Sequence, residues 1–233
     1  MKITLQRKQL AGWLPEMLLV LAPLFLFVVL AKEVVKNNFS SIDWYLLSYF
    51  HGLANPSLDR IMLFFTSLGS VKFYFLAFPA ILLVLVWRRR WWELKGFSLS
   101  FLGAVLLNNL LKISFHRIRP NLYLIKESGY SFPSGHAMVT LAFYGMLLFF
   151  AFQHIPSRKW RSLMAILAVF VILTIGVSRV YLGVHYPSDV LGSYLAGFSW
   201  LVVSIIAIKR LHCKRVFLGK IEKLPPEHWF TGT

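Results

Sequence analysis

Long apolar runs alternate with short polar and charged segments along most of the chain. Six runs are almost free of charge and lie at residues 14–31, 71–87, 96–115, 136–153, 160–178 and 189–208. Each is about long enough to cross the roughly 30 Å hydrocarbon core of a bilayer as a helix. Helices satisfy their own backbone polar groups in lipid, so the pattern predicts an all-α polytopic membrane bundle of six transmembrane helices.

The segment between the first two runs, residues 37–70, has a different pattern. Its apolar stretches are interrupted by Asp43, His51, Asp59 and Arg60. We expect this segment to form short interfacial helices rather than a further span.

Composition excludes other classes of protein. Of the 233 residues, 58% are hydrophobic and 15% are charged, which does not describe a water-soluble surface. The one cysteine, Cys213, cannot form an intramolecular disulfide, and its basic neighbours favour the reducing, cytoplasmic side. There is no internal repeat or flexible linker, so we expect one domain, residues 1–233, with a cytoplasmic tail at 209–233.

The basic residues orient the predicted bundle. With both termini in the cytoplasm, sixteen of the 25 Lys and Arg residues are cytoplasmic, in segments 2–8, 88–95, 158–161 and 209–223. The inverted arrangement would break the positive-inside rule at every short loop. Many of these residues adjoin span ends beside tryptophans, so the net charge of +16 indicates contact with membrane lipids rather than nucleic acid. We expect a multi-pass protein of the cell (inner or plasma) membrane.

The first span has an alternative interpretation as a signal peptide. Lys2, Arg7 and Lys8 precede its apolar run, and residues 29–31 loosely resemble a cleavage site. The run is long for a signal peptide, so we favour an uncleaved helix. Residue 32 would be outside in either case, so the orientation of the other spans does not depend on this choice.

Ionisable residues gather near the outer ends of the third to sixth spans, where membrane helices ordinarily avoid them. These residues are Lys112, Arg119, His136, Arg179, His185 and Asp189. Charged groups are costly at membrane depth and usually mark a function. Three cations, two histidines and a carboxylate on one side of the bilayer indicate an anion site with acid–base chemistry.

Lys112 and Arg119 are seven residues apart, so on a continuing helix they would share one face. Pro120 disfavours helix at Arg119, which would then project beyond the end of the third span. A lysine point charge beside a planar arginine fork suits phosphate oxygens. Alone, the pair is equally consistent with cations that extend to the membrane interface.

The tetrapeptide Pro133-Ser134-Gly135-His136 precedes the fourth span. We expect Ser134 to cap the helix and Gly135 to allow close approach of the backbone. The free N–H groups of the helix N-terminus would then form an anion cradle beside His136. Alone, the tetrapeptide fits a simple capped helix start better than a binding site.

His185 and Asp189 lie at the junction of the fifth and sixth spans. Pro187 suits the first turn of the sixth span, which places Asp189 one turn beyond His185. A carboxylate that accepts the Nδ1 proton would leave Nε2 free as a nucleophile or base. The alternative, a pair that only ties a loop, is disfavoured by the nearby Arg179.

Taken in order, these segments resemble the three-part signature of the type 2 phosphatidic acid phosphatase superfamily. The pattern is Lys-x6-Arg-Pro, then Pro-Ser-Gly-His, then Ser-Arg-x5-His-x3-Asp, and every position matches. The matching residues are Lys112, Arg119, Pro120, Pro133, Ser134, Gly135, His136, Ser178, Arg179, His185 and Asp189. The six-span layout is similar to the bacterial membrane branch, the phosphatidylglycerophosphatase B and undecaprenyl-diphosphatase type.

The resemblance implies a metal-independent phosphatase that acts on a lipid phosphomonoester or diphosphate at the extracytoplasmic face, with undecaprenyl diphosphate or phosphatidylglycerophosphate as the leading substrates. It also implies roles for individual residues. The phosphate would be clamped by Lys112, Arg119 and Arg179 and cradled by backbone N–H groups around Ser134 and Gly135. His185, oriented by Asp189, would attack phosphorus to give a phosphohistidine, and His136 would protonate the leaving oxygen.

No Asp or Glu cluster suited to Mg²⁺ accompanies the motifs, so we expect no metal and no other cofactor.

Two other functions stay open. A lipid phosphotransferase would pass the phosphoryl group to an alcohol. A non-catalytic lipid-binding or lipid-transport bundle would need only the cations, so the intact His185 and Asp189 argue against it. The sequence leaves the identity of the lipid and the oligomeric state open.

Overall fold

The structure is a computed structural model that describes the backbone of residues 2–221 and the side chains of residues 14–212. The described backbone is helical, without strands, which confirms the predicted all-α class. Its helices are α1 (Lys2–Val35), α2 (Ser40–Gly52), α3 (Pro56–Ser67), α4 (Val71–Trp87), α5 (Trp91–Phe115), α6 (Gly135–His154), α7 (Arg158–Tyr181) and α8 (Pro187–Ile221). The predicted tail at 209–233 therefore begins as a continuation of α8. Its last part, 222–233, and the Cys213 side chain lie outside the described residues.

Five helices of the described chain are individually long and apolar enough to cross a membrane. They are α1 from Leu14, α5, α6, α7, and α8 as far as His212. The second predicted span corresponds to α4, which has 17 residues and passes the same test only together with α3. These two helices are bent by 41° relative to each other, so the predicted six spans result when the bent pair counts as one.

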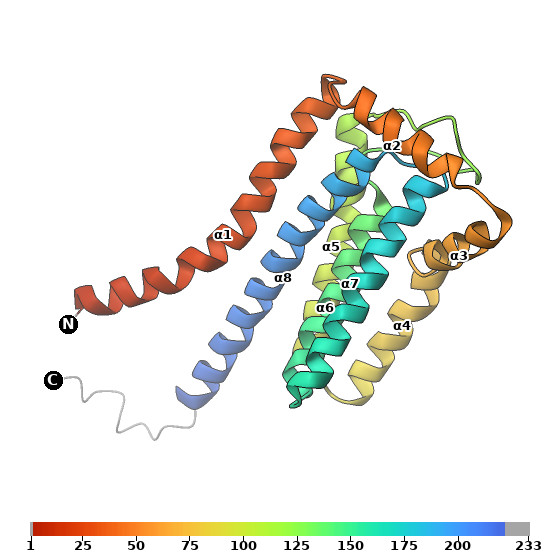
Figure 1. Ribbon diagram of the computed structural model, residues 1–233. Coiled ribbons are helices and arrows are strands. Elements are labelled where there is room, and N and C mark those ends of the chain that lie inside the picture. Colours follow the sequence, from red (N-terminus) through yellow and green to blue (C-terminus); the bar gives the residue numbers. More distant parts are fainter. Residues whose placement is uncertain (1, 222–233) are drawn as a thin grey trace.

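Local capping explains where α3 and α4 begin. The side chain of Asn55 accepts hydrogen bonds from the N–H groups of Ser57 and Leu58, and Pro56 occupies the first position of α3. The hydroxyl of Ser70 caps α4. Figure 1 shows α2 running across one end of the bundle. The segment 37–70 is thus helical as predicted, and its interfacial location stays a prediction.

The centre of the bundle is α6, which packs against α5, α7 and α8 (Figure 1). Phe143 and Met146 of α6 join Phe97 and Phe101 of α5 in the main apolar cluster. Lipid gives packed helices little hydrophobic driving force, so close approach and interhelical contacts stabilise the bundle. Gly103 illustrates this approach, because a Cβ atom there would lie 2.1 Å from the ring of Trp200 in α8.

The helix α5 begins at Trp91, five residues before the apolar run predicted at 96–115, and so includes Glu93. Glu93 is buried and lies 3.0 Å from Arg90 and 2.8 Å from His154 at the end of α6. These partners compensate a charge that would otherwise be excluded from a packed helix.

Candidate active site

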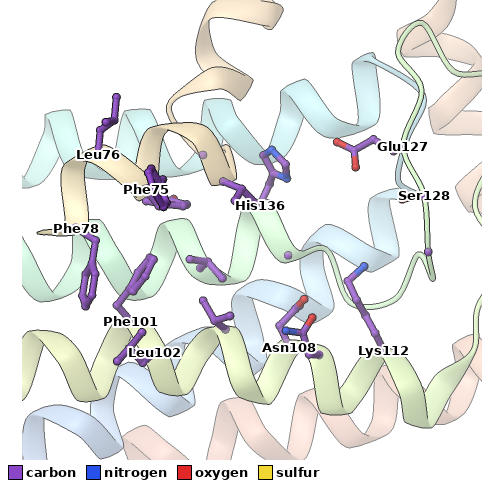
Figure 2. A pocket seen from close by; sticks show the side chains of 18 of the residues that line it. Phe75, Leu76, Phe78, Phe101, Leu102, Asn108, Lys112, Glu127, Ser128 and His136 are labelled. Atoms are coloured by element: carbon purple, nitrogen blue, oxygen red, sulfur yellow. The ribbon is translucent and has the colours of Figure 1, made fainter.

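A cavity of about 1200 Å³ at one end of the bundle is lined by residues of all three motifs. They are Lys112, Arg119, Gly135, His136 and His185. Figure 2 shows Lys112 and His136 at one end of the cavity, with aromatic and aliphatic side chains of α4 and α5 at the other. Residues that are distant in the sequence thus meet in one space.

His185 lies in a tight turn between α7 and α8. Gly183 has a φ of 71°, and a Cβ atom there would lie 1.8 Å from the carbonyl oxygen of Leu122. Only glycine suits both this left-handed backbone and the close approach. The N–H groups of Val184 and His185 donate to the carbonyl oxygen of Arg179 at 3.2 and 3.3 Å. The turn therefore holds His185 against the end of α7.

His185 and Asp189 form the predicted pair, with Nδ1 of the imidazole 3.4 Å from Oδ2 of the carboxylate. Both side chains are buried. Burial lowers the pKa of His185 to about 3, against the opposing effect of Asp189, so the ring is neutral at physiological pH. The carboxylate can only accept, which places the proton on Nδ1. Nε2 is then unprotonated, and its lone pair accepts from Arg119 at 3.1 Å.

Lys112 and Arg119 donate to successive carbonyl groups of the loop that leads to α6. Nζ of Lys112 lies 2.5 Å from the carbonyl oxygen of Tyr130. The guanidinium of Arg119 donates to Ser128 and Gly129 at 3.2 and 3.0 Å. These carbonyl dipoles offset the repulsion between the cations, and burial lowers the pKa of Arg119.

Arg179 does not line the cavity directly, but its ion-pair partner Glu127 does. The arginine is buried, and its Nη2 lies 2.6 Å from the carboxylate of Glu127, a residue of the cavity wall. Its Nη1 donates to the hydroxyl of Thr66 at 2.6 Å. Figure 2 shows Glu127 near the same end of the cavity as His136 and Lys112. All three predicted phosphate-binding cations are thus bonded to the segment 127–130.

Ser134 occupies the N-cap position of α6, but the predicted side-chain cap is wrong. Its hydroxyl is buried and has no hydrogen-bond partner within the described part of the chain. Its N–H instead donates to the carbonyl oxygen of Asp189 at 3.3 Å, which joins the start of α6 to α8. The first N–H groups of α6 lack intrahelical acceptors, as at any helix start, and suit an anion.

Four residues at the site were not predicted from the sequence. They are Asp43, Arg117, Glu127 and Ser131. Arg117 forms ion pairs with both Asp189 and Asp43, and the hydroxyl of Ser131 donates to Asp189. Arg117 lies within the first motif, at one of its unspecified positions, and Asp43 is a charge in an otherwise apolar stretch. Among residues 14–212, no three His, Cys, Asp or Glu side chains form a group that could hold a metal ion.

Comparison with known proteins gives consistent matches. The profile of the PAP2 superfamily matches residues 93–213. Phosphatidylglycerophosphatase B of Bacillus subtilis (strain 168) is 34% identical over 180 residues, which cover 75% of this chain and 87% of that protein. An undecaprenyl-diphosphatase of Sulfolobus acidocaldarius is 27% identical over 198 residues, 81% of this chain and 86% of that protein.

A solved structure is also similar to this one. The crystal structure of a transmembrane PAP2-type phosphatidylglycerolphosphate phosphatase from Bacillus subtilis superposes with a TM-score of 0.74 at 31% sequence identity. The match covers 84% of this chain and 97% of the other. The profile match includes all three motifs and more than half of the chain, which confirms the predicted resemblance. The chain belongs to the PAP2 superfamily and is a metal-independent lipid phosphatase with a multi-pass helical fold.

Proposed function

We propose that the chain hydrolyses a lipid phosphomonoester or diphosphate at the extracytoplasmic face of the cell membrane, through a phosphohistidine on His185. The observation that carries this proposal is the composition of one cavity. A neutral histidine and two cations at one end continue into an apolar groove between α4 and α5. A phosphorylated headgroup suits the first part, and a hydrocarbon chain suits the second.

The groove is open to the lipid phase along α4. Phe75, Leu76 and Leu83 line it and are each at least 70% exposed. Leu102 and Val105 line the side formed by α5. Exposed side chains of this kind contact acyl or isoprenoid chains in a bilayer. A substrate can therefore keep its tail in the membrane while its phosphate enters the site.

In the proposed first step, Nε2 of His185 attacks phosphorus. The N–P bond forms as the P–O bond to the lipid breaks, and Asp189 stabilises the positive charge that develops on the ring. His136 donates a proton to the leaving oxygen. In the second step, His136 takes a proton from water, the water oxygen attacks phosphorus, and cleavage of the N–P bond releases inorganic phosphate.

The transferring phosphoryl group needs charge stabilisation at its oxygens, which Lys112, Arg119 and Arg179 supply. Each of these cations would exchange a bond with the segment 127–130 for a bond with phosphate. The N–H groups around Ser134 and Gly135 would complete the cradle. No metal ion is required by this scheme.

The sidedness of the site rests on the distribution of basic residues, with sixteen of 25 on the side opposite the motifs. An impermeant maleimide added to intact cells tests it. A Lys126→Cys variant, altered at an exposed loop position, should be labelled in intact cells. The native Cys213, expected in the cytoplasm, is the internal control and should react only after lysis. The reverse pattern would refute the orientation.

Undecaprenyl diphosphate and phosphatidylglycerophosphate are the substrates we propose first, because relatives are named for activity on them. Phosphate release should be measured in detergent with these two lipids, phosphatidate and a lipid A phosphate, in excess chelator and with His185→Ala as the blank. Release in chelator supports metal-free hydrolysis. Loss of the lipid phosphate without free phosphate would instead indicate a phosphotransferase, and no turnover of any lipid would contradict the proposal.

A further inference from the structure

Arg117 lies between Lys112 and Arg119 in the sequence but does not line their cavity. Its Nη1 lies 2.5 Å from Oδ1 of Asp189, and its Nη2 lies 2.7 Å from Oδ2 of Asp43. The side chains of the two carboxylates are at most 1% exposed and that of the arginine 15%. The guanidinium therefore joins α2 to the start of α8 on the side of Asp189 away from His185.

The two oxygens of Asp189 have different partners. Oδ2 faces Nδ1 of His185 and accepts hydrogen bonds from the Ser131 hydroxyl and, at 2.9 Å, from the N–H of Tyr186. Oδ1 accepts from Arg117. The torsion that rotates a carboxylate about its bond to Cβ is broad and has no sharp minimum. The bond from Arg117 to Oδ1 therefore adds to the two donors on Oδ2 in keeping that oxygen directed at His185.

Arg117 is itself held in place. Asp43 accepts from its guanidinium and from the N–H and hydroxyl of Ser188, at 3.0 and 2.5 Å. The guanidinium also lies 4.3 Å from the ring centre of Tyr186. A planar fork can bridge two carboxylates and stack on a ring at the same time, whereas a lysine ammonium is a single point charge.

We propose that Arg117, held by Asp43, is a positioning residue for phosphoryl transfer. It fixes the carboxylate of Asp189, which in turn orients His185 so that Nε2 points at phosphorus. This inference rests on the proposed function, because it takes His185 as the nucleophile. Since Arg117 contacts neither the phosphate cavity nor His185, its loss should lower kcat and leave phosphate affinity unchanged.

The first experiment compares arginine variants in detergent, with kcat for a lipid phosphate and the inhibition constant of inorganic phosphate as readouts. Arg117→Met should lower kcat about a hundredfold, the usual scale for a misplaced catalytic group, without changing the inhibition constant. The kcat of Arg117→Lys should lie between that of Arg117→Met and that of wild type. Arg179→Met should raise the inhibition constant. Arg60→Met is the matched control, because Arg60 is exposed and donates only to the carbonyl oxygen of Pro56 among the hydrogen bonds described. Its kcat and its inhibition constant for phosphate should equal those of wild type.

The second experiment separates positioning from a purely structural role. Arg117→Met leaves the buried carboxylate of Asp43 without its ion-pair partner, which itself destabilises the fold. The double variant Arg117→Met/Asp43→Asn removes that charge and should recover much of the thermal stability. Under the proposal its kcat stays low, because nothing restores the bond to Oδ1 of Asp189.

Three results would overturn the inference. They are a wild-type kcat in Arg117→Met, a kcat that recovers together with stability in the double variant, and a rise in the phosphate inhibition constant that accounts for the loss. His185→Ala is measured alongside and reports separately on the proposed function. Full activity in that variant would refute the nucleophile, whereas an inactive His185→Ala with a fully active Arg117→Met would refute only the role of Arg117.

Discussion

Each end of the helix bundle buries a carboxylate that is paired with an arginine and a histidine. Where α5 begins and α6 ends, Glu93 lies 3.0 Å from Arg90 and 2.8 Å from His154. The side chain of His154 is 42% exposed, and none of the three residues lines the 1200 Å³ cavity. This group ties two helices together at their ends.

At the opposite end, Asp189 lies 2.5 Å from Arg117 and 3.4 Å from His185. Here the histidine side chain is 2% exposed to solvent and lines the cavity beside Lys112 and Arg119. Both ends therefore combine a carboxylate, an arginine and a histidine. What distinguishes the proposed catalytic end is a histidine that lines a cavity together with Lys112 and Arg119, cations suited to phosphate.

Replacing the two histidines gives the largest expected contrast. His185→Ala should abolish turnover and any acid-labile phosphoenzyme, because the proposed nucleophile is lost. His154→Ala should keep a kcat close to wild type. Both variants are measured for lipid phosphate hydrolysis and for retained phosphate after an acid quench. Comparable losses of activity in the two variants would contradict the proposed role of His185 as the nucleophile.

Replacing the two carboxylates should give a somewhat smaller contrast. Asp189→Asn should keep the fold but lower kcat by up to about 10⁴-fold, because an amide can favour the wrong tautomer of His185. Glu93→Gln should keep kcat while lowering the free energy of unfolding by about 1 to 3 kcal/mol, since a buried polar network loses its charge. Steady-state kinetics and thermal unfolding in detergent measure both effects. A kcat loss in Glu93→Gln as large as that in Asp189→Asn would contradict the assignment.

The role proposed for His136 should depend on the leaving group. His136→Ala should slow hydrolysis of a lipid phosphomonoester roughly a hundredfold, because an alkoxide needs a proton to depart. The same variant should lose less activity on a nitrophenyl phosphate, whose leaving group is a weak base, provided that chemistry limits both rates. Equal losses on both substrates would show that His136 only binds or orients the phosphate.

Glu127 should give the smallest effect. Its carboxylate is 30% exposed and pairs with Arg179 at the site where we expect phosphate. Glu127→Gln should lower the inhibition constant of inorganic phosphate about two- to fivefold, the scale of a partly exposed ion pair, because the competing charge is removed. Glu33→Gln is the control, since Glu33 forms an ion pair with Lys36 away from the site. Weaker phosphate inhibition in Glu127→Gln would mean that Glu127 supports the anion site.

Local sequence properties account for the elements that were predicted correctly. Hydropathy located α4 and placed the ends of the other spans within five residues of those of the candidate membrane segments, because the length and polarity of a span are set by the bilayer. The side-chain cap predicted at Ser134 was wrong, and a partner from another helix is involved there. The amide of Ser134 donates to the carbonyl oxygen of Asp189 in α8, and its side chain does not cap α6. The extension of α5 before its apolar run likewise places Glu93 beside His154 of α6, as well as Arg90.

The sequence by itself determined the all-α membrane class and the six motif residues that meet around one end of the bundle. Tertiary structure alone showed that Glu93 and His154 form a second carboxylate–histidine pair away from the cavity, and that Arg117 reaches Asp43, 74 residues away, as well as Asp189. The physical reason is that hydrophobic periodicity and motif spacing are properties of neighbouring residues. A buried charge is stabilised by whichever partner the packing of distant helices brings within hydrogen-bond distance, and this partner has no local signature in the sequence.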